Sequence, residues 1–431
     1  MNESVAFLGK CEVTDMKEMK DSGIEWIGVI PEKWTCCKQK YVIQLLNGRA
    51  YKDTEFEEDG KYKILRVGNL FTNPVWYTSS MELEPNKYCD KGDLLYSWSM
   101  SYAPIIWDGE KVIYHYHIWK AVLDEAIDKK FAYYYLMSLT DALMSEIHET
   151  TMGFITMGIM NNSYIAYPSF EEQVEISKYL DCQCSEIDAL SADIQTQIDT
   201  LEAYKRSKVF ETVSQGIDHL DYLETDSDVW KTIPQGWKLV DIKYLFEIVK
   251  RIAGKEGFDV IAITQKGLKY KDISSNEGQI ASDYSGYQFV YPGDFAMNHM
   301  DLLTGWVDLS DKFGVTSPDY RVFRLRYPNE YDRTYYKYVM QCCYMCRIFY
   351  SLGQGVSNLG RWRLQTSAFN DFKVPVPPYE EQVKIGEYLE NLITEVNETI
   401  SLKQKQLEVL SDYKKSLIYE YVTGKKEVPA V

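Results

Sequence analysis

The stretch that decides the fold is "YPSFEEQVEISKYL" at residues 167–180, because the chain carries it again as "PPYEEQVKIGEYL" at 377–389. The shared Glu-Glu-Gln-Val tetrapeptide falls at 171–174 and at 380–383, an offset of 209 residues. A long repeat period of this kind indicates two copies of one structural unit. The sequence therefore predicts a duplicated architecture.

Three further matched pairs occur in the same order in both halves of the chain. They are "WIGVIPEKW" (26–34) with "WKTIPQGW" (230–237), "KGDLLYSWSM" (91–100) with "PGDFAMNHM" (292–300), and "LEAYKRS" (201–207) with "LSDYKKS" (410–416). Each half thus runs from an opening motif through a divergent segment to the Pro-x-Glu-Gln motif.

The segment after each Pro-x-Glu-Gln motif is predicted to be a long helix. Residues 174–213 contain no proline or glycine, and about 40 residues at 1.5 Å rise give a rod of roughly 60 Å. Apolar residues recur at steps of three, four or seven: Ile187, Leu190, Ile194, Ile198 and Leu201, then Val396, Ile400, Leu407, Leu410, Leu417 and Tyr421. Polar Gln197 and Lys403 make each seam imperfect, and neither rod is expected to be stable alone with so narrow a seam, so we expect the two helices to pair with each other. Because a whole globular segment separates the two copies, we expect this pairing to be antiparallel.

The divergent segments mix short β-like runs with aromatic helical runs, the clearest helices being at 131–147 and 333–349. The predicted fold class is mixed α/β. It has two globular domains in tandem repeat, separated by two long helices in an antiparallel coiled coil with pseudo-twofold symmetry. The expected divisions are an N-terminal extension (1–17), domain 1 (18–166), spacer helix 1 (167–216), domain 2 (217–375), spacer helix 2 (376–425) and a C-terminal tail (426–431).

Composition favours folded domains in a reducing compartment. The chain is 45% apolar and 14% aromatic, and its nine irregularly spaced cysteines do not resemble a disulfide framework. The N-terminus lacks a signal-peptide pattern, and no apolar run reaches the ~18 residues of a membrane span. The net charge of −17 argues against a simple nucleic-acid coat, but residues 251–370 carry a balance of +2. Local DNA binding is therefore compatible with the charge.

The opening stretch "KDSGIEWIGVIPEKW" (20–34), the doubled Pro-x-Glu-Gln motif, the Gly-Asp before a strand and the two helices resemble the specificity subunit of type I restriction–modification systems. The resemblance covers about residues 18–425. It implies two target-recognition domains that each bind half of a split DNA site. It also implies a non-catalytic chain on which two methyltransferase subunits and restriction/translocase subunits assemble in a prokaryotic cytoplasm.

The resemblance further implies that this chain binds no cofactor or metal of its own. S-adenosylmethionine for adenine N6 methylation, and ATP and Mg for restriction, are expected on partner subunits. The stretch "VPPY" (376–379) looks like an amino-methyltransferase motif, but its leading Val376 cannot accept a hydrogen bond. A protein-binding coiled-coil adaptor without DNA specificity remains the alternative.

Candidate DNA-binding residues are polar or aromatic groups expected at the ends of strands or in glycine-rich loops. Loops after the Gly-Asp strands supply Ser97, Trp98, Ser99, Asn298 and His299. The glycine-rich "GQGVSNLGRWRLQ" (353–365) supplies Gln354, Asn358, Arg361 and Arg363. The corresponding stretch of the first half, "TTMGFITMGIMNNS" (150–163), supplies Asn161 and Asn162. Arg66, Asn69 and Lys266 complete the set. Amides can pair with adenine edges, and arginine with guanine or phosphate.

Two motifs are given structural interpretations. "HYH" (115–117) would place two imidazoles on one face of a strand, but the nearby sequence offers no further metal ligand. "CCYMC" (342–346) lies in an aromatic-rich predicted helix, where cysteines usually pack as small apolar groups. We therefore expect "HYH" to be structural or solvent-facing and "CCYMC" to belong to the core.

Overall fold

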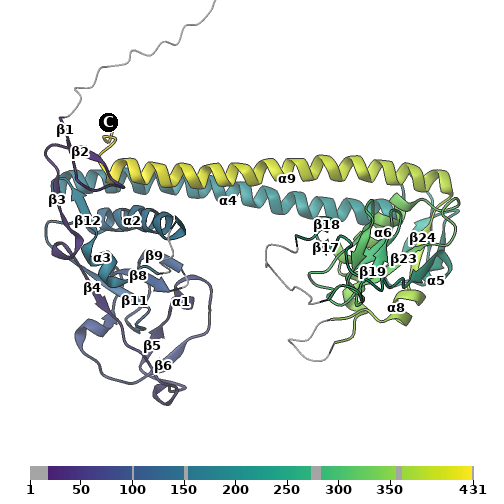
Figure 1. Cartoon of the computed structure of the whole chain (residues 1–431), viewed down its shortest axis with the longest axis horizontal. Coiled ribbons are helices and arrows are strands. Elements are labelled where there is room, and N and C mark those ends of the chain that lie inside the picture. Colours follow the sequence, from purple (N-terminus) through teal and green to yellow (C-terminus); the bar gives the residue numbers. More distant parts are fainter. Residues whose placement is uncertain (1–17, 100, 150–153, 273–282, 356–361, 430–431) are drawn as a thin grey trace, which may run out of the picture. The chain divides into compact units, whose positions relative to one another are not determined.

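The computed structural model describes residues 18–99, 101–149, 154–272, 283–355 and 362–429, and for 147–149 the backbone only. Its contacts divide the chain into two compact units. Unit 1 is Met1–Asp193 with Gln406–Val431, and unit 2 is Ile194–Lys405. The helices α4 (Phe170–Gln215) and α9 (Tyr379–Val422) each contribute to both units (Figure 1).

Unit 1 contains two four-stranded sheets, in the orders β4-β11-β8-β9 and β6-β5-β10-β7, and the pairs β1-β2 and β3-β12. Its strands are β1 Met19–Asp21, β2 Val29–Pro31, β3 Thr35–Lys38, β4 Ile43–Asn47, β5 Tyr62–Leu65, β6 Tyr77–Ser79, β7 Tyr88–Cys89, β8 Leu94–Ser99, β9 Ser101–Ile106, β10 Val112–Tyr114, β11 Ile118–Leu123 and β12 Tyr164–Tyr167. Its shorter helices are α1 Val67–Phe71, α2 Lys129–Glu149 and α3 Met157–Asn162.

Unit 2 contains one four-stranded sheet, in the order β16-β23-β20-β21, and the pairs β13-β14, β15-β24, β17-β18 and β19-β22. Its strands are β13 Tyr222–Glu224, β14 Thr232–Pro234, β15 Lys238–Asp241, β16 Phe246–Val249, β17 Ile261–Thr264, β18 Gly267–Tyr270, β19 Gln288–Val290, β20 Phe295–Met297, β21 Val307–Leu309, β22 Gly314–Thr316, β23 Arg321–Leu325 and β24 Lys373–Val376. Its shorter helices are α5 Ile242–Leu245, α6 Arg333–Met345, α7 Ile348–Ser351 and α8 Thr366–Asp371.

The two units share one topology although their interior sequences differ. The sheet β4-β11-β8-β9 corresponds strand by strand to β16-β23-β20-β21. In unit 1, β5 and β10 pair in parallel; in unit 2, a parallel bridge between Val260 and Val315 joins the same two places. The predicted class of two mixed α/β domains in tandem repeat is confirmed.

The glutamine of each Pro-x-Glu-Gln motif is a buried clamp between helices. In unit 1, Gln173 accepts a hydrogen bond from the Asp128 amide (2.9 Å) and donates to the carbonyls of Ala126 (2.9 Å) and Pro168 (3.0 Å). In unit 2, Gln382 accepts from the Asp332 amide (2.9 Å) and donates to the Pro377 carbonyl (2.8 Å).

These hydrogen bonds hold the start of the long helix against the start of α2 or α6. Both side-chain amides are almost completely buried, where an unpaired polar group is costly. The same residue type is therefore needed in both copies.

The glutamate before each clamp connects the two repeated anchors. The indole of Trp34 in the opening motif donates to Glu172 (3.4 Å), and that of Trp237 donates to Glu381 (2.9 Å). Both indoles are buried. The opening motif and the Pro-x-Glu-Gln motif thus recur together because they contact each other.

A third contact is repeated about two helical turns further along each long helix. The Tyr134 hydroxyl of α2 donates to Asp181 (2.9 Å), and the Tyr338 hydroxyl of α6 donates to Glu390 (2.9 Å). The two carboxylates are related by the 209-residue offset. Each unit therefore fixes its long helix at several places.

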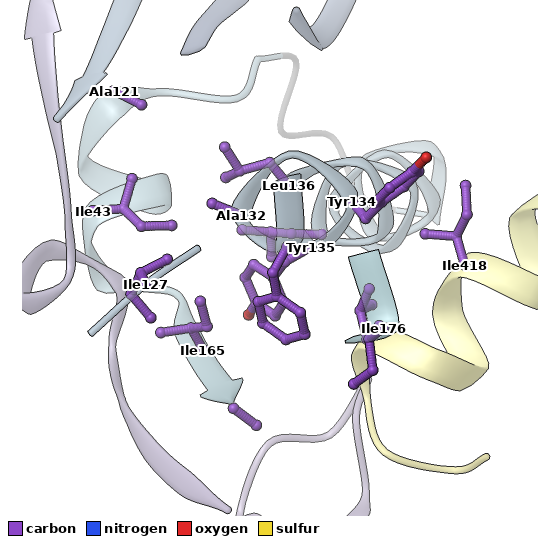
Figure 2. Close-up of a cluster of buried hydrophobic side chains, with 14 of the residues drawn as sticks. Ile43, Ala121, Ile127, Ala132, Tyr134, Tyr135, Leu136, Ile165, Ile176 and Ile418 are labelled. Atoms are coloured by element: carbon purple, nitrogen blue, oxygen red, sulfur yellow. The ribbon is translucent and has the colours of Figure 1, made fainter. Parts of the chain in front are cut away.

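Each unit has its own aromatic-rich core beneath these contacts. Figure 2 shows the unit 1 core, in which Tyr135 of α2 lies among side chains that include Ile165 of β12 and Ile176 of α4. The unit 2 core is built around Tyr335, Tyr336 and Phe369. Cys342 and Cys343 are fully buried in it on α6, so the core interpretation of "CCYMC" is confirmed for these residues.

Within each unit, α4 and α9 run antiparallel, as expected. In unit 1, Tyr179 packs on Tyr421 and Lys414 pairs with Asp188 (2.7 Å). As the residue number rises on one helix, it falls on the other. In unit 2, the contacts of Lys205 with Asn397 (3.1 Å) and of Lys403 with Gln197 follow the same direction.

The two polar residues that interrupt the predicted seam are therefore partners, because the Lys403 ammonium donates to the Gln197 amide oxygen. The seam prediction holds for Ile187, Ile194 and Ile198, which are buried, but it is wrong for Leu190, which is 49% exposed. One helical turn of 3.6 residues after Ile187 falls between positions 190 and 191. The half-buried Ser191, and not Leu190, therefore faces the partner helix.

Replacing Gln173 with Ala should lower the free energy of unfolding by about 3 kcal/mol, because it leaves the Asp128 amide and two carbonyls without their partner. Replacing the exposed Gln195 of the same helix with Ala is the matched control and should change it by less than about 0.5 kcal/mol. Urea denaturation of the full chain measures both. Equal stability of the two variants would contradict the clamp.

Candidate nucleic-acid interface

The repeated Gly-Asp pairs are turns that position the middle strand of each main sheet. Gly92 and Gly293 both have φ +90°, in the left-handed region that glycine tolerates. The Asp93 carboxylate accepts the Asp90 amide (2.8 Å), and Asp294 accepts the Tyr291 amide (2.8 Å). The turns therefore lead in the same way into β8 and β20, whose far ends carry the first candidate residues.

A cation neutralises each of these aspartates from a different place in the sheet. Lys120 of β11 pairs with Asp93 (2.6 Å), whereas Arg251, just after β16, pairs with Asp294. The Gly-Asp turn is thus the same in both units, while the cation that pairs with its aspartate lies in or beside a different strand.

In unit 1 the candidates Ser97, Trp98 and Ser99 belong to strand β8, so the expectation that they lie in a loop is wrong. The strand continues because β11 and β9 pair with it on both sides. Ser97 is buried, and its hydroxyl has no hydrogen-bond partner among the described residues. Trp98 is half-buried and stacks on Trp119, with ring centroids 5.6 Å apart.

"HYH" (115–117) forms the turn between β10 and β11, so its expected position on a strand face is wrong. The Trp98 indole donates to the Tyr116 carbonyl (2.8 Å) and contacts the His117 ring edge to face. Tyr116 is exposed, while both histidines are half-buried. Burial, with His117 and Arg66 nearby, lowers the pKa of His115 to about 4, so this imidazole is neutral at pH 7.

Arg66 lies close enough to the "HYH" turn to act electrostatically on both of its histidines, whereas the Asn69 side chain is engaged in hydrogen bonds with nearby backbone. Arg66 is exposed, caps α1 and lies 5.1 Å over the Tyr77 ring. The Asn69 side chain accepts the Arg66 amide (3.2 Å) and donates to the Val75 carbonyl (2.8 Å). Unit 1 therefore gathers Arg66, Trp98 and the "HYH" turn into one aromatic and cationic cluster.

In unit 2 the candidates Asn298 and His299 directly follow β20. Asn298 accepts the Met300 amide in a local turn (3.3 Å). His299 is only 6% exposed, and its Nδ1 has no hydrogen-bond partner among the described residues. Burial, with Arg321 and Arg363 nearby, lowers the pKa of His299 to about 3, so it is neutral at pH 7.

The remaining candidates lie in three other places. Gln354 and Arg363 form a backbone bridge (3.0 and 3.2 Å), with the Arg363 side chain exposed. Lys266 sits in the turn between β17 and β18, at a cavity of about 670 Å³ that several carboxylates also line. Asn358 and Arg361 lie outside the described residues.

The pair Asn161 and Asn162 ends helix α3. Asn162 accepts from Lys38 (3.4 Å) and donates to the Gly158 carbonyl (2.9 Å). The amide of Asn162 is thus used within the scaffold.

Sequence reasoning missed two features that the structure brings to corresponding places. "HYH" was expected to be structural or solvent-facing, and Arg321 was not among the candidate residues. Strand register makes Trp119 and Arg321 equivalent, since Trp119 faces Tyr96 and Arg321 faces Met297. A charged residue in a strand gives no sign in the sequence that it is buried.

The comparisons with known proteins agree with this duplicated architecture. Residues 31–200 and 234–409 match the family described as "Type I restriction modification DNA specificity domain", once in each half. The chain belongs to this family of type I restriction–modification specificity subunits, which act in DNA target recognition. Members of the family are non-catalytic.

Over its length the chain is similar to the type I restriction enzyme MjaVIII specificity subunit of Methanocaldococcus jannaschii. They are 24% identical over 422 residues, 93% of this chain and 94% of the relative. The EcoBI specificity subunit of Escherichia coli is 20% identical over 229 residues, 51% of this chain and 48% of the relative.

Among solved structures, a chain described as "Structural basis underlying complex assembly and conformational transition of the type I R-M system" matches with a TM-score of 0.62. It is 13% identical and covers 92% of this chain and 99% of its own length, which supports the fold. In the part of the chain that the structure describes, no helix is long and apolar enough to span a bilayer, and no three potential metal ligands cluster.

Unit 2 should lose stability in acid through His299. Its folded pKa is lowered to about 3, so the unfolded chain, at about 6.5, binds the proton more tightly. The contribution is present above pH 6.5 and is lost as pH falls toward 3, with a slope of up to about 1.4 kcal/mol per pH unit. The difference in unfolding free energy between wild type and His299→Asn, measured by urea denaturation from pH 7.5 to 4.5, should shrink with acid. A constant difference would contradict this assignment.

Proposed function

We propose that this chain directs a type I restriction–modification complex to a bipartite DNA target, with each unit binding one half. The observation that carries the proposal is that one scaffold occurs twice with different residues at corresponding places. Trp98 and Trp119 in unit 1 correspond to His299 and Arg321 in unit 2. Since Trp119, His299 and Arg321 are buried, these differences would act by shaping the exposed surface around them, and a different surface would favour a different base sequence.

In this proposal the long helices α4 and α9 serve as the spacer between the two DNA-contacting domains. Helices of 46 and 44 residues correspond to rods of about 69 and 66 Å. The proposed arrangement is pseudo-twofold, which matches the dyad of DNA and would make the two half-sites face opposite ways.

The partners in this proposal are two methyltransferase subunits, followed by restriction/translocase subunits. Repeat-related aromatic residues are exposed on both helices: Tyr204 (43%) corresponds to Tyr413 (52%), and Phe170 (45%) to Tyr379 (46%). Exposed aromatics are favoured at interfaces. Their duplication would suit two copies of one partner.

Catalysis in this proposal belongs to the partners, in a prokaryotic cytoplasm. They would bind S-adenosylmethionine for adenine N6 methylation, and ATP and Mg for restriction. A protein-binding adaptor without DNA specificity is the second candidate, favoured by the net charge of −17.

Co-expression of the chain with the methyltransferase encoded beside its gene, in a host without adenine methylation, tests the proposal. Single-molecule sequencing of the host genome should show N6-methyladenine at one split motif, with two specific parts and a fixed unspecific gap. The methyltransferase expressed alone is the control and should leave this motif unmodified. An intact complex without methylation at any such motif would favour the adaptor.

A further inference from the structure

A small cavity in unit 2 contains an unusual excess of positive charge. Its volume is about 240 Å³, and its lining includes Lys250, Arg321 and Arg363 but only one carboxylate, that of Asp319. Lys250 and Arg363 are exposed at its rim, and neither forms an ion pair with a carboxylate among the described residues. The cavity lies where β20 ends and β23 begins.

The guanidinium of Arg321 is buried, and no carboxylate among the described residues pairs with it. The side chain is 4% exposed, and it contacts only neutral groups among the described residues: the Leu364 carbonyl (3.2 Å), the Thr366 hydroxyl (3.3 Å), the Met297 sulfur (3.9 Å) and the Phe369 ring (4.5 Å to the centroid). A buried charge normally has a partner of opposite sign, since its desolvation is costly. A bound anion would supply that partner.

His299 adds a second unsatisfied group to the same cavity. It is 94% buried, and its Nδ1 lacks a hydrogen-bond partner among the described residues. The Met297 backbone also forms a hydrogen bond with this ring, so His299 lines the cavity as a neutral imidazole and is not counted as a ligand of the anion. Burial first, and then the neighbouring Arg321 and Arg363, keep the pKa of this ring low, so it adds no positive charge of its own at pH 7.

The corresponding place in unit 1 holds no such charge. There Trp119 occupies the position of Arg321, and it stacks on Trp98, which occupies the position of His299. Gly48 and Asn47 stand near the positions of Arg251 and Lys250 in the matching strand. The cavity is therefore a feature of unit 2 and not of the repeated scaffold.

We propose that this cavity binds one phosphate of the DNA backbone. The exposed Lys250 and Arg363 contact the phosphate oxygens, and the buried Arg321 adds positive charge at the base of the cavity. The inference rests on the proposed function, since it takes the anion to be part of the DNA target. The site would fix the register of unit 2 on DNA without selecting a base. Its chemistry would equally suit free phosphate, which the test separates.

The test uses the complex of the full chain with its methyltransferase. It compares wild type, Lys250→Gln and Arg363→Gln on a 30-base-pair duplex with the methylated motif and on a scrambled duplex. Each variant should reduce the slope of log Kd against log[NaCl] by about 0.9, equally on both duplexes, because one phosphate contact is lost. The matched control is Arg324→Gln, because Arg324 is exposed like Lys250 and Arg363 but pairs with Glu247 and does not line the cavity; this variant should leave the slope unchanged.

Unchanged slopes for both variants, in a wild-type complex that prefers the motif duplex, would overturn the cavity assignment alone. If the variants bound only the motif duplex more weakly, the residues would contact bases and not a phosphate, and this result would also overturn the cavity assignment. A wild-type complex that binds neither duplex would overturn the proposed function and the cavity together. Stabilisation of wild type but not of the variants by inorganic phosphate, with unchanged DNA slopes, would assign a free anion and overturn the DNA contact.

Discussion

The buried glutamine of the Pro-x-Glu-Gln motif is the constraint on which each unit depends. Gln173 and Gln382 satisfy an amide and one or two carbonyls at a place where the chain turns into a long helix. In a low-dielectric interior these hydrogen bonds are stronger than in water, and leaving any of them unmade is more costly. Only a side chain with both a donor and an acceptor at this length can replace them all.

The clamp allows the rest of the unit to vary. It joins the long helix, the short helix beside it and, through the neighbouring glutamate, the tryptophan of the opening motif. Because these contacts fix the frame, the sheets inside can exchange aromatic, imidazole and guanidinium groups without a change of topology. Divergent recognition surfaces on a common frame follow from this separation.

The sequence allowed prediction of the duplication, the antiparallel helices and the mixed α/β class, because repeats and helical periodicity are local patterns. It did not allow prediction of details that depend on strand pairing. Ser97–Ser99 belong to a strand because β9 and β11 flank them, and "HYH" is a turn because two sheets meet there. The burial of Arg321 likewise depends on packing by α8 and the chain before it, which no spacing reveals.

The central claim is that two copies of one frame contact two independent parts of a DNA target. Replacing residues 217–375 with a second copy of residues 18–166 keeps both long helices and gives both positions the same contact residues. Methylation sequencing with the native methyltransferase should then report a symmetric motif, in which one original half-site appears twice in opposite orientation. A folded chimaera that still methylates the original asymmetric motif would contradict the account.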